Sequence, residues 1–61
     1  MIRIEIETET AAFGEYPGYE VARILDVLVS RFEHYPHNPM GESCELLDIN
    51  GNTVGEMEVV E

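Results

Sequence analysis

The sequence lacks lysine and tryptophan, and its three arginines are set against thirteen aspartates and glutamates, a formal net charge of −10. Phosphate backbones repel a surface of this sign, so direct binding to nucleic acid is not expected. The single cysteine, Cys44, excludes an intramolecular disulfide and suits a reducing compartment. Since no segment resembles a signal peptide or reaches transmembrane length, we predict a cytoplasmic protein without a membrane partner.

The chain is also too short to form a large hydrophobic core. The 61 residues suffice for a single domain, and a chain of this size buries only about 60% of the surface that it exposes when unfolded. A dry cavity for a substrate or cofactor would take core volume that this chain cannot spare. The sequence also has no glycine-rich phosphate loop and no catalytic triad with a plausible oxyanion site. We therefore predict that the protein is not an enzyme and holds no cofactor.

Metal ligands are few as well. His34, His37 and Cys44 are close in sequence, but a structural zinc site takes four ligands and the chain has no second cysteine. The favoured interpretation is one histidine at a helix end and one in a loop. We predict no metal site.

What is present is a regular apolar pattern. Residues 2–9 alternate between β-branched and charged side chains, which predicts a strand covered on one face only. Residues 18–34 carry apolar side chains at helical spacing, and Pro36 should stop that helix. Between the two, residues 11–13 are expected to tuck the connecting loop against the edge of the core.

Two further β-like runs, residues 43–48 and 52–60, flank an Asn-Gly pair, which is the strongest short-range signal for a hairpin. One alternative is a two-residue type I′ turn at Asn50 and Gly51. The other is a longer turn that starts at Asp48, with Gly51 as a left-handed bulge residue. The two alternatives shift the pairing, so the register of the hairpin stays open.

These elements predict an α+β fold with the order βαββ. The helix must bury its apolar stripe against one face of the sheet. A right-handed crossover makes the first and second strands parallel. We place the third strand between them and antiparallel to both, which gives a three-stranded sheet in the order 1-3-2.

The same fold would gather carboxylates on the open sheet face. If the isoleucines of the first strand face the helix, the glutamates between them face solvent beside those of the third strand. Like charges opposite one another across strands are destabilising, so a face without lysine calls for a functional explanation. The predicted partner-binding residues are Glu5, Glu7, Glu9, Glu56, Glu58, Glu45, Glu15, Glu20, Asp26 and Glu33.

Three segments carry a resemblance to known proteins: residues 11–13 (AAF), 17–25 (PGYEVARIL) and 47–55 (LDINGNTVG). Together they resemble small acidic proteins of phages and other mobile elements, a class similar to the compact anti-CRISPR inhibitors. The resemblance implies a phage-encoded protein in the host cell cytoplasm, and it makes a Cascade-type surveillance complex a candidate target through DNA mimicry. Such inhibitors share no common signature, so no residue roles are carried over.

The favoured hypothesis is therefore an inhibitor that binds a basic, DNA-binding host protein through protein–protein contacts. The main alternative is a small structural or assembly module that forms a homodimer through its helix or a sheet edge. A weaker alternative is a protein that sequesters a small ligand in a pocket beside residues 10–18.

Overall fold

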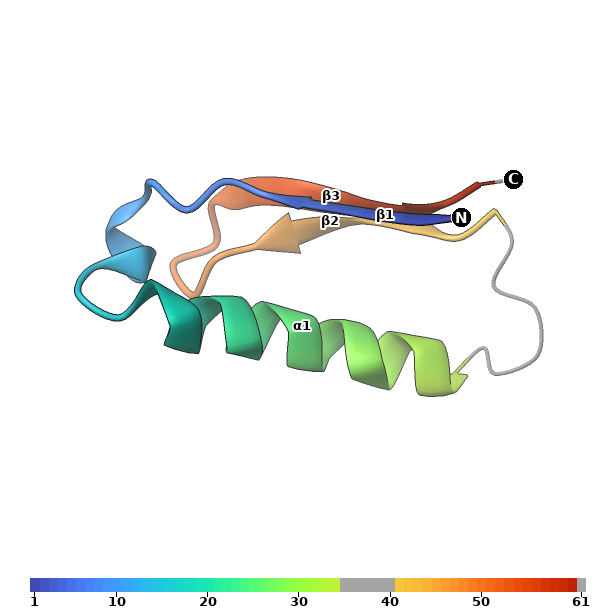
Figure 1. The fold of residues 1–61 in the computed structure, drawn as a ribbon, viewed down its shortest axis with the longest axis horizontal. Helices are drawn as coiled ribbons and strands as arrows, with labels where there is room; N and C mark the ends of the chain where they lie inside the picture. Colours follow the sequence, from blue (N-terminus) through green and yellow to red (C-terminus); the bar gives the residue numbers. More distant parts are fainter. Residues whose placement is uncertain (35–40, 61) are drawn as a thin grey trace.

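The protein forms a three-stranded antiparallel sheet with one long helix along one of its faces (Figure 1). This is a computed structural model, and it describes residues 1–34 and 41–60. The strand order is β1-β3-β2, so the predicted α+β fold with the third strand in the centre is confirmed. In chain order the elements are β1 (Ile2–Ile6), the 3₁₀ helix η1 (Ala11–Phe13), α1 (Pro17–His34), β2 (Ser43–Leu47) and β3 (Thr53–Val59).

Helix α1 forms where the apolar spacing predicts it. Proline suits the first turn of a helix, where its missing N–H costs no hydrogen bond, and Pro17 begins α1. Glu20 in the first turn and Arg31 in the last complement the helix dipole. Ile24 and Leu28 are buried against the sheet. Among the described residues, no helix is long and apolar enough to cross a membrane.

The core lies between α1 and the sheet and is closed at one end by η1. Phe13 of η1 is only 2% exposed, as the expected tucking of this loop requires. Met57, in the central strand, is the most deeply buried side chain of the cluster, at 0%. The buried apolar residues are Phe13, Ile24, Leu28, Leu46, Val54, Met57 and Val59.

Strand β1 is shorter than the predicted range of residues 2–9, because it ends at Ile6. The N–H of Glu7 still donates to the carbonyl of Val54, at 2.7 Å. Beyond this point the chain turns toward η1, and the hydroxyl of Thr10 donates to the carboxylate of Asp48, at 2.7 Å. The chain therefore leaves the sheet to bring Phe13 over the core.

Strand β3 contains an irregularity that the sequence pattern did not predict. Leu46 pairs with Gly55, whereas Leu47 pairs with Thr53, so Val54 is an extra residue on the β3 side. An extra residue shifts the alternation of side chains beyond it. As a result both Val54 and Met57 are buried, although they are three residues apart.

The β2–β3 turn adopts the longer of the two alternatives. The N–H of Gly51 donates to the carbonyl of Asp48 at 3.0 Å, and the N–H of Asp48 donates to the carbonyl of Asn52 at 2.9 Å. Gly51 has a φ of +86°, and no described residue other than glycine has a positive φ. A type I′ turn needs positive φ at Asn50 as well, so it is excluded.

Candidate functional site: the acidic sheet face

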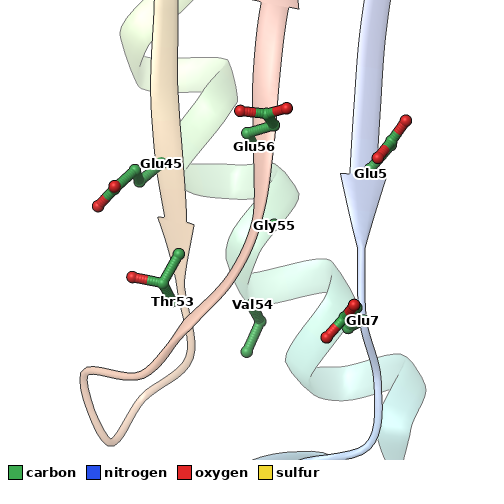
Figure 2. A pocket seen from close by; sticks show the side chains of 7 residues that line it. All are labelled: Glu5, Glu7, Glu45, Thr53, Val54, Gly55 and Glu56. Atoms are coloured by element: carbon green, nitrogen blue, oxygen red, sulfur yellow. The ribbon is translucent and has the colours of Figure 1, made fainter.

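Three glutamates lie side by side across the open face of the sheet (Figure 2). Glu56 of β3 is directly opposite Glu5 of β1 on one side and Glu45 of β2 on the other. We call these three residues the acidic row. Adjacent strands are about 4.8 Å apart, so neighbouring carboxylates of the row lie close together. Glu7 follows two residues after Glu5, and the four glutamates line one surface hollow with Thr53, Val54 and Gly55.

The hollow has no basic residue in its lining. Within the described residues, the carboxylates of Glu5, Glu7, Glu45 and Glu56 make no hydrogen bond or ion pair. Like charges directly opposite one another on a sheet are destabilising. The row therefore weakens the fold slightly, and its charge is uncompensated within the described part of the chain.

Glu58 differs from the row although it lies on the same face. Its carboxylate pairs with Arg3, which is directly opposite on β1, with an N–O distance of 2.9 Å. Its charge is thus compensated at one end of the face. Glu9 is exposed, but it lies beyond the end of β1 and does not line the hollow.

The remaining predicted residues do not join the acidic row. Asp26 and Glu33 are exposed on α1, which lies on the other side of the sheet, and Glu15 is exposed in the loop before α1. The negative charge therefore lies on both the helix side and the open side of the sheet. Of these two sides, only the open face sets carboxylates directly opposite one another on neighbouring strands.

Glu20 does not extend the exposed acidic surface, because it is buried with 7% exposure. Both of its oxygens accept hydrogen bonds from Arg23, each at 2.9 Å, and one also accepts the N–H of Ile49. The hydrogen bonds from Arg23 lower the pKa of Glu20 against the opposing effect of burial. This carboxylate links α1 to the β2–β3 turn and is structural. The spacing of Glu20 and Arg23 along the helix was the available signal.

Asp48 is a second buried carboxylate whose role the sequence pattern did not indicate. One oxygen accepts the N–H groups of Asn50 and Asn52, and the other accepts the Thr10 hydroxyl and the Asn52 side-chain amide. Burial acts to raise the pKa of Asp48, but the hydrogen bonds from Asn52 and Thr10 outweigh it and lower the pKa to about 2. Asp48 therefore remains charged and organises the turn.

Metal ligands and a surface hollow near η1 are two alternatives that the sequence raises, and the structure bears on each within residues 1–34 and 41–60. In the part of the chain that the structure describes, no three His, Cys, Asp or Glu side chains gather in a way that could hold a metal ion. His37 lies outside the described residues. A surface hollow beside the loop before α1 is lined by Phe13, Tyr16 and Tyr19 among others. No buried polar side-chain atom without a partner lies in that hollow among the described residues.

The chain matches no protein-family model, no curated protein and no solved structure.

Proposed function

We propose that the protein is an inhibitor that binds a basic, DNA-binding host protein, with its carboxylates in the positions that DNA phosphates occupy on that protein. The observation that carries the proposal is the acidic row, in which three glutamates from three strands lie in register with no basic residue in the hollow they line. A sequence selected for stability alone would be expected to place lysine on such a face.

The spacing of the carboxylates supports the proposal. Glu5 and Glu7 are alternate residues, which are about 6.7 Å apart along an extended chain. This separation is about twice the spacing of charges along one DNA strand, which is about 3.4 Å. Across the strands the spacing is about 4.8 Å. A rigid sheet holds these charges in place before binding, so little ordering free energy is lost when a partner binds.

The resemblance to small acidic phage proteins makes a Cascade-type surveillance complex the first target to test. Such a complex carries its nucleic acid in a positively charged channel, and an acidic surface would be steered toward it at low salt. The assay is a gel shift of the purified surveillance complex with its target duplex, titrated with the protein. We expect the wild-type protein to prevent the shift.

The decisive variant is the triple substitution Glu5→Gln, Glu45→Gln and Glu56→Gln. The matched control is Glu15→Gln, Asp26→Asn and Glu33→Gln, which removes the same charge from other exposed parts of the molecule. We expect the acidic-row variant to lose at least about tenfold in inhibitory potency, which corresponds to about 1.4 kcal/mol. The control should stay within about threefold of wild type.

Two results would refute the proposal. If both triple variants lose potency equally, net charge alone is responsible, and if the acidic-row variant keeps full potency, the row is irrelevant. Should the wild-type protein leave the surveillance complex unaffected, the immobilised protein can be tested against host lysate. Binding partners that fit the proposal are displaced by duplex DNA and are lost with the acidic-row variant only.

An assembly module is the competing proposal, and salt distinguishes the two. Association through carboxylates should weaken steeply between low and high ionic strength, because salt screens exposed charges within about 10 Å at 0.1 M. Association through apolar side chains should change little over the same range.

A further inference from the structure

The two edges of the sheet differ in whether other parts of the chain cover them. The N–H of Val59 donates to the carbonyl of Glu42, so the even-numbered residues of β2 bond to β3. By the alternation of an antiparallel ladder, the backbone groups of Ser43, Glu45 and Leu47 point to the outer edge. At that edge the carbonyl of Ser43 accepts a hydrogen bond from Arg31 at 3.2 Å, and the carbonyl of Leu47 accepts one from Arg23 at 2.8 Å. Two helix arginines thus occupy the edge of β2.

The outer edge of β1 has no such cover among the described residues. Met1 and Val60 exchange backbone hydrogen bonds, and the N–H of Glu7 donates to Val54, so the odd-numbered residues of β1 bond to β3. By the alternation of an antiparallel ladder, the backbone N–H and C=O groups of Ile2, Ile4 and Ile6 point away from β3. An edge of this kind is a template for another strand.

Apolar side chains beside this edge are also uncovered. Ile2 and Ile4 lie opposite Val59 and Met57, so they point to the helix side, yet they are 51% and 40% exposed. In Figure 2, α1 crosses behind the sheet obliquely, from behind Glu7 toward β2, and so diverges from β1 along its length.

Two helix residues extend this uncovered surface. Leu25 and Val29 are 40% and 51% exposed. Helical spacing puts them on the opposite flank of the buried stripe from Arg23 and Val27, which line a groove with β2. They therefore lie on the β1 side of α1, the flank that faces the uncovered edge.

We propose that a second copy of the chain pairs with this edge, β1 against β1 in antiparallel orientation, with Ile4 opposite Ile4 of the second copy. The twofold axis then passes through this pair, perpendicular to the sheet. The two three-stranded sheets join into one continuous sheet, and both helices lie on the same side of it. Such a symmetric, self-complementary contact is the commonest arrangement in homodimers.

The charges of Arg3 and Glu5 favour this register over the neighbouring ones. With Ile4 opposite Ile4, Arg3 lies directly opposite Glu5 of the second copy, and Glu5 lies opposite Arg3 of the second copy. These are pairs without mutual backbone hydrogen bonds, in which side chains are closest. Because the edge offers hydrogen bonds only at alternate residues, the neighbouring registers differ by two residues. One of them sets Arg3 against Arg3 and the other sets Glu5 against Glu5.

On the helix side the same register brings apolar surfaces together. The uncovered isoleucines of the two β1 strands become neighbours, and Leu25 and Val29 of each copy face those of the other across them. Strands lie about 4.8 Å apart, and a helix with its side chains is about 10–12 Å wide. The three strands of each copy are together wider than one helix, so both helices fit on the same side of the joined sheet.

Charge exchange at Arg3 and Glu5 tests the proposal, with the molar mass in solution measured by sedimentation equilibrium. We expect the wild type to be a dimer, and we expect Arg3→Glu alone and Glu5→Arg alone each to raise the dissociation constant at least about tenfold. Mixing the two single variants should restore a dimer that contains one of each. The double variant Arg3→Glu with Glu5→Arg should also dimerise, because it reverses both partners of each pair.

Glu58→Gln is the control, because it removes the partner of Arg3 within the chain and leaves the proposed contact intact. It should dimerise as the wild type does, and circular dichroism verifies that every variant is folded. The proposal is overturned if the wild type remains monomeric at about 1 mM. It is equally overturned if the single variants dimerise as tightly as the wild type, or if neither mixing nor the double variant restores the dimer.

Discussion

Gly55 lies in β3 directly opposite Ile6 of β1, where there is no room for a side chain. A Cβ atom at this position would lie 1.8 Å from the backbone oxygen of Glu5. The contact is with main chain, which cannot rotate away as a side chain can. The backbone of β1 would have to move, and the hydrogen bond between Glu7 and Val54 would move with it.

We therefore expect Gly55→Ala to lower the free energy of unfolding by about 2–3 kcal/mol, as overpacking of a core does. Gly18→Ala is the matched control, because its Cβ would meet nothing within 4 Å and its position is helical. Alanine favours helix over glycine by up to about 1 kcal/mol, so the control should be neutral or stabilising. Urea unfolding measures both, and an unchanged Gly55→Ala protein would contradict the close approach.

Asp48 makes the stability depend on pH in the acid range. The pKa in the folded protein is about 2, below the ordinary value of 3.8. A carboxylate with a lowered pKa stabilises the fold above its ordinary pKa, and this contribution is lost as pH falls toward the folded value. Glu20, whose pKa is also lowered, acts in the same direction.

The Asp48→Asn variant should melt several degrees below the wild type at neutral pH, because an amide nitrogen cannot accept the bonds from Thr10 and Asn52. The difference between variant and wild type should shrink as pH falls from about 4 toward 2. Asp26→Asn, on the exposed face of α1, is the control and should melt as the wild type does. A difference that stays constant with pH would argue against a charged Asp48.

At the scale of elements, β3 is the strand on which the acidic row depends. Glu56 has a glutamate directly opposite it on both neighbouring strands. Like charges opposite one another cost about 0.2–1 kcal/mol per pair. Neutralising the central residue removes two such contacts at once, whereas neutralising either outer residue removes one.

Glu56→Gln should thus raise the free energy of unfolding by about 0.5–1 kcal/mol at low salt. The gain should shrink at high salt, where exposed charges are screened. Glu33→Gln is the control, since this exposed residue lies on α1 and its removal changes the net charge equally. Thermal unfolding at two salt concentrations provides the measurement. Equal effects of the two substitutions would show that only net charge matters.

Local patterns predicted most of the elements, and tertiary contacts decided the rest. The helical spacing within residues 18–34 and the Asn-Gly pair are local signals, and they correspond to α1 (Pro17–His34) and to the turn between β2 and β3. Strand β1 ends at Ile6, and the chain beyond it is tied to the β2–β3 turn by the bond from Thr10 to Asp48, a contact between residues far apart in sequence. Periodicity contains no information on such a contact.

The acidic row could be predicted in part. Alternation placed Glu5 and Glu56 on the open face, and the strand order made them neighbours. The extra residue at Val54 affects the register that sets Glu45 opposite Glu56, and the pairing of Arg3 with Glu58 compensates one carboxylate of the face. Neither follows from spacing along one strand. Glu20 was expected on the surface, because a carboxylate is seldom buried unless it is paired.

At the scale of the whole molecule, a large net charge is opposed by only a small hydrophobic core. The chain carries a formal net charge of −10, while the described core is a single cluster between α1 and one face of the sheet. Self-repulsion of that charge acts against the compact state. Two of the few cations are engaged in structural contacts, since Arg23 binds Glu20 and Leu47, and Arg31 binds Ser43 and Glu42.

The arginines at the edge of β2 also limit how far association can proceed. A sheet with two open edges can add copies at both, and repeated addition produces a fibril. Here Arg23 and Arg31 satisfy two carbonyls of β2 that an incoming strand would need. Pairing through β1 covers the one remaining open edge of each copy among the described strands. No edge is then left for a third copy, so association would stop at the dimer.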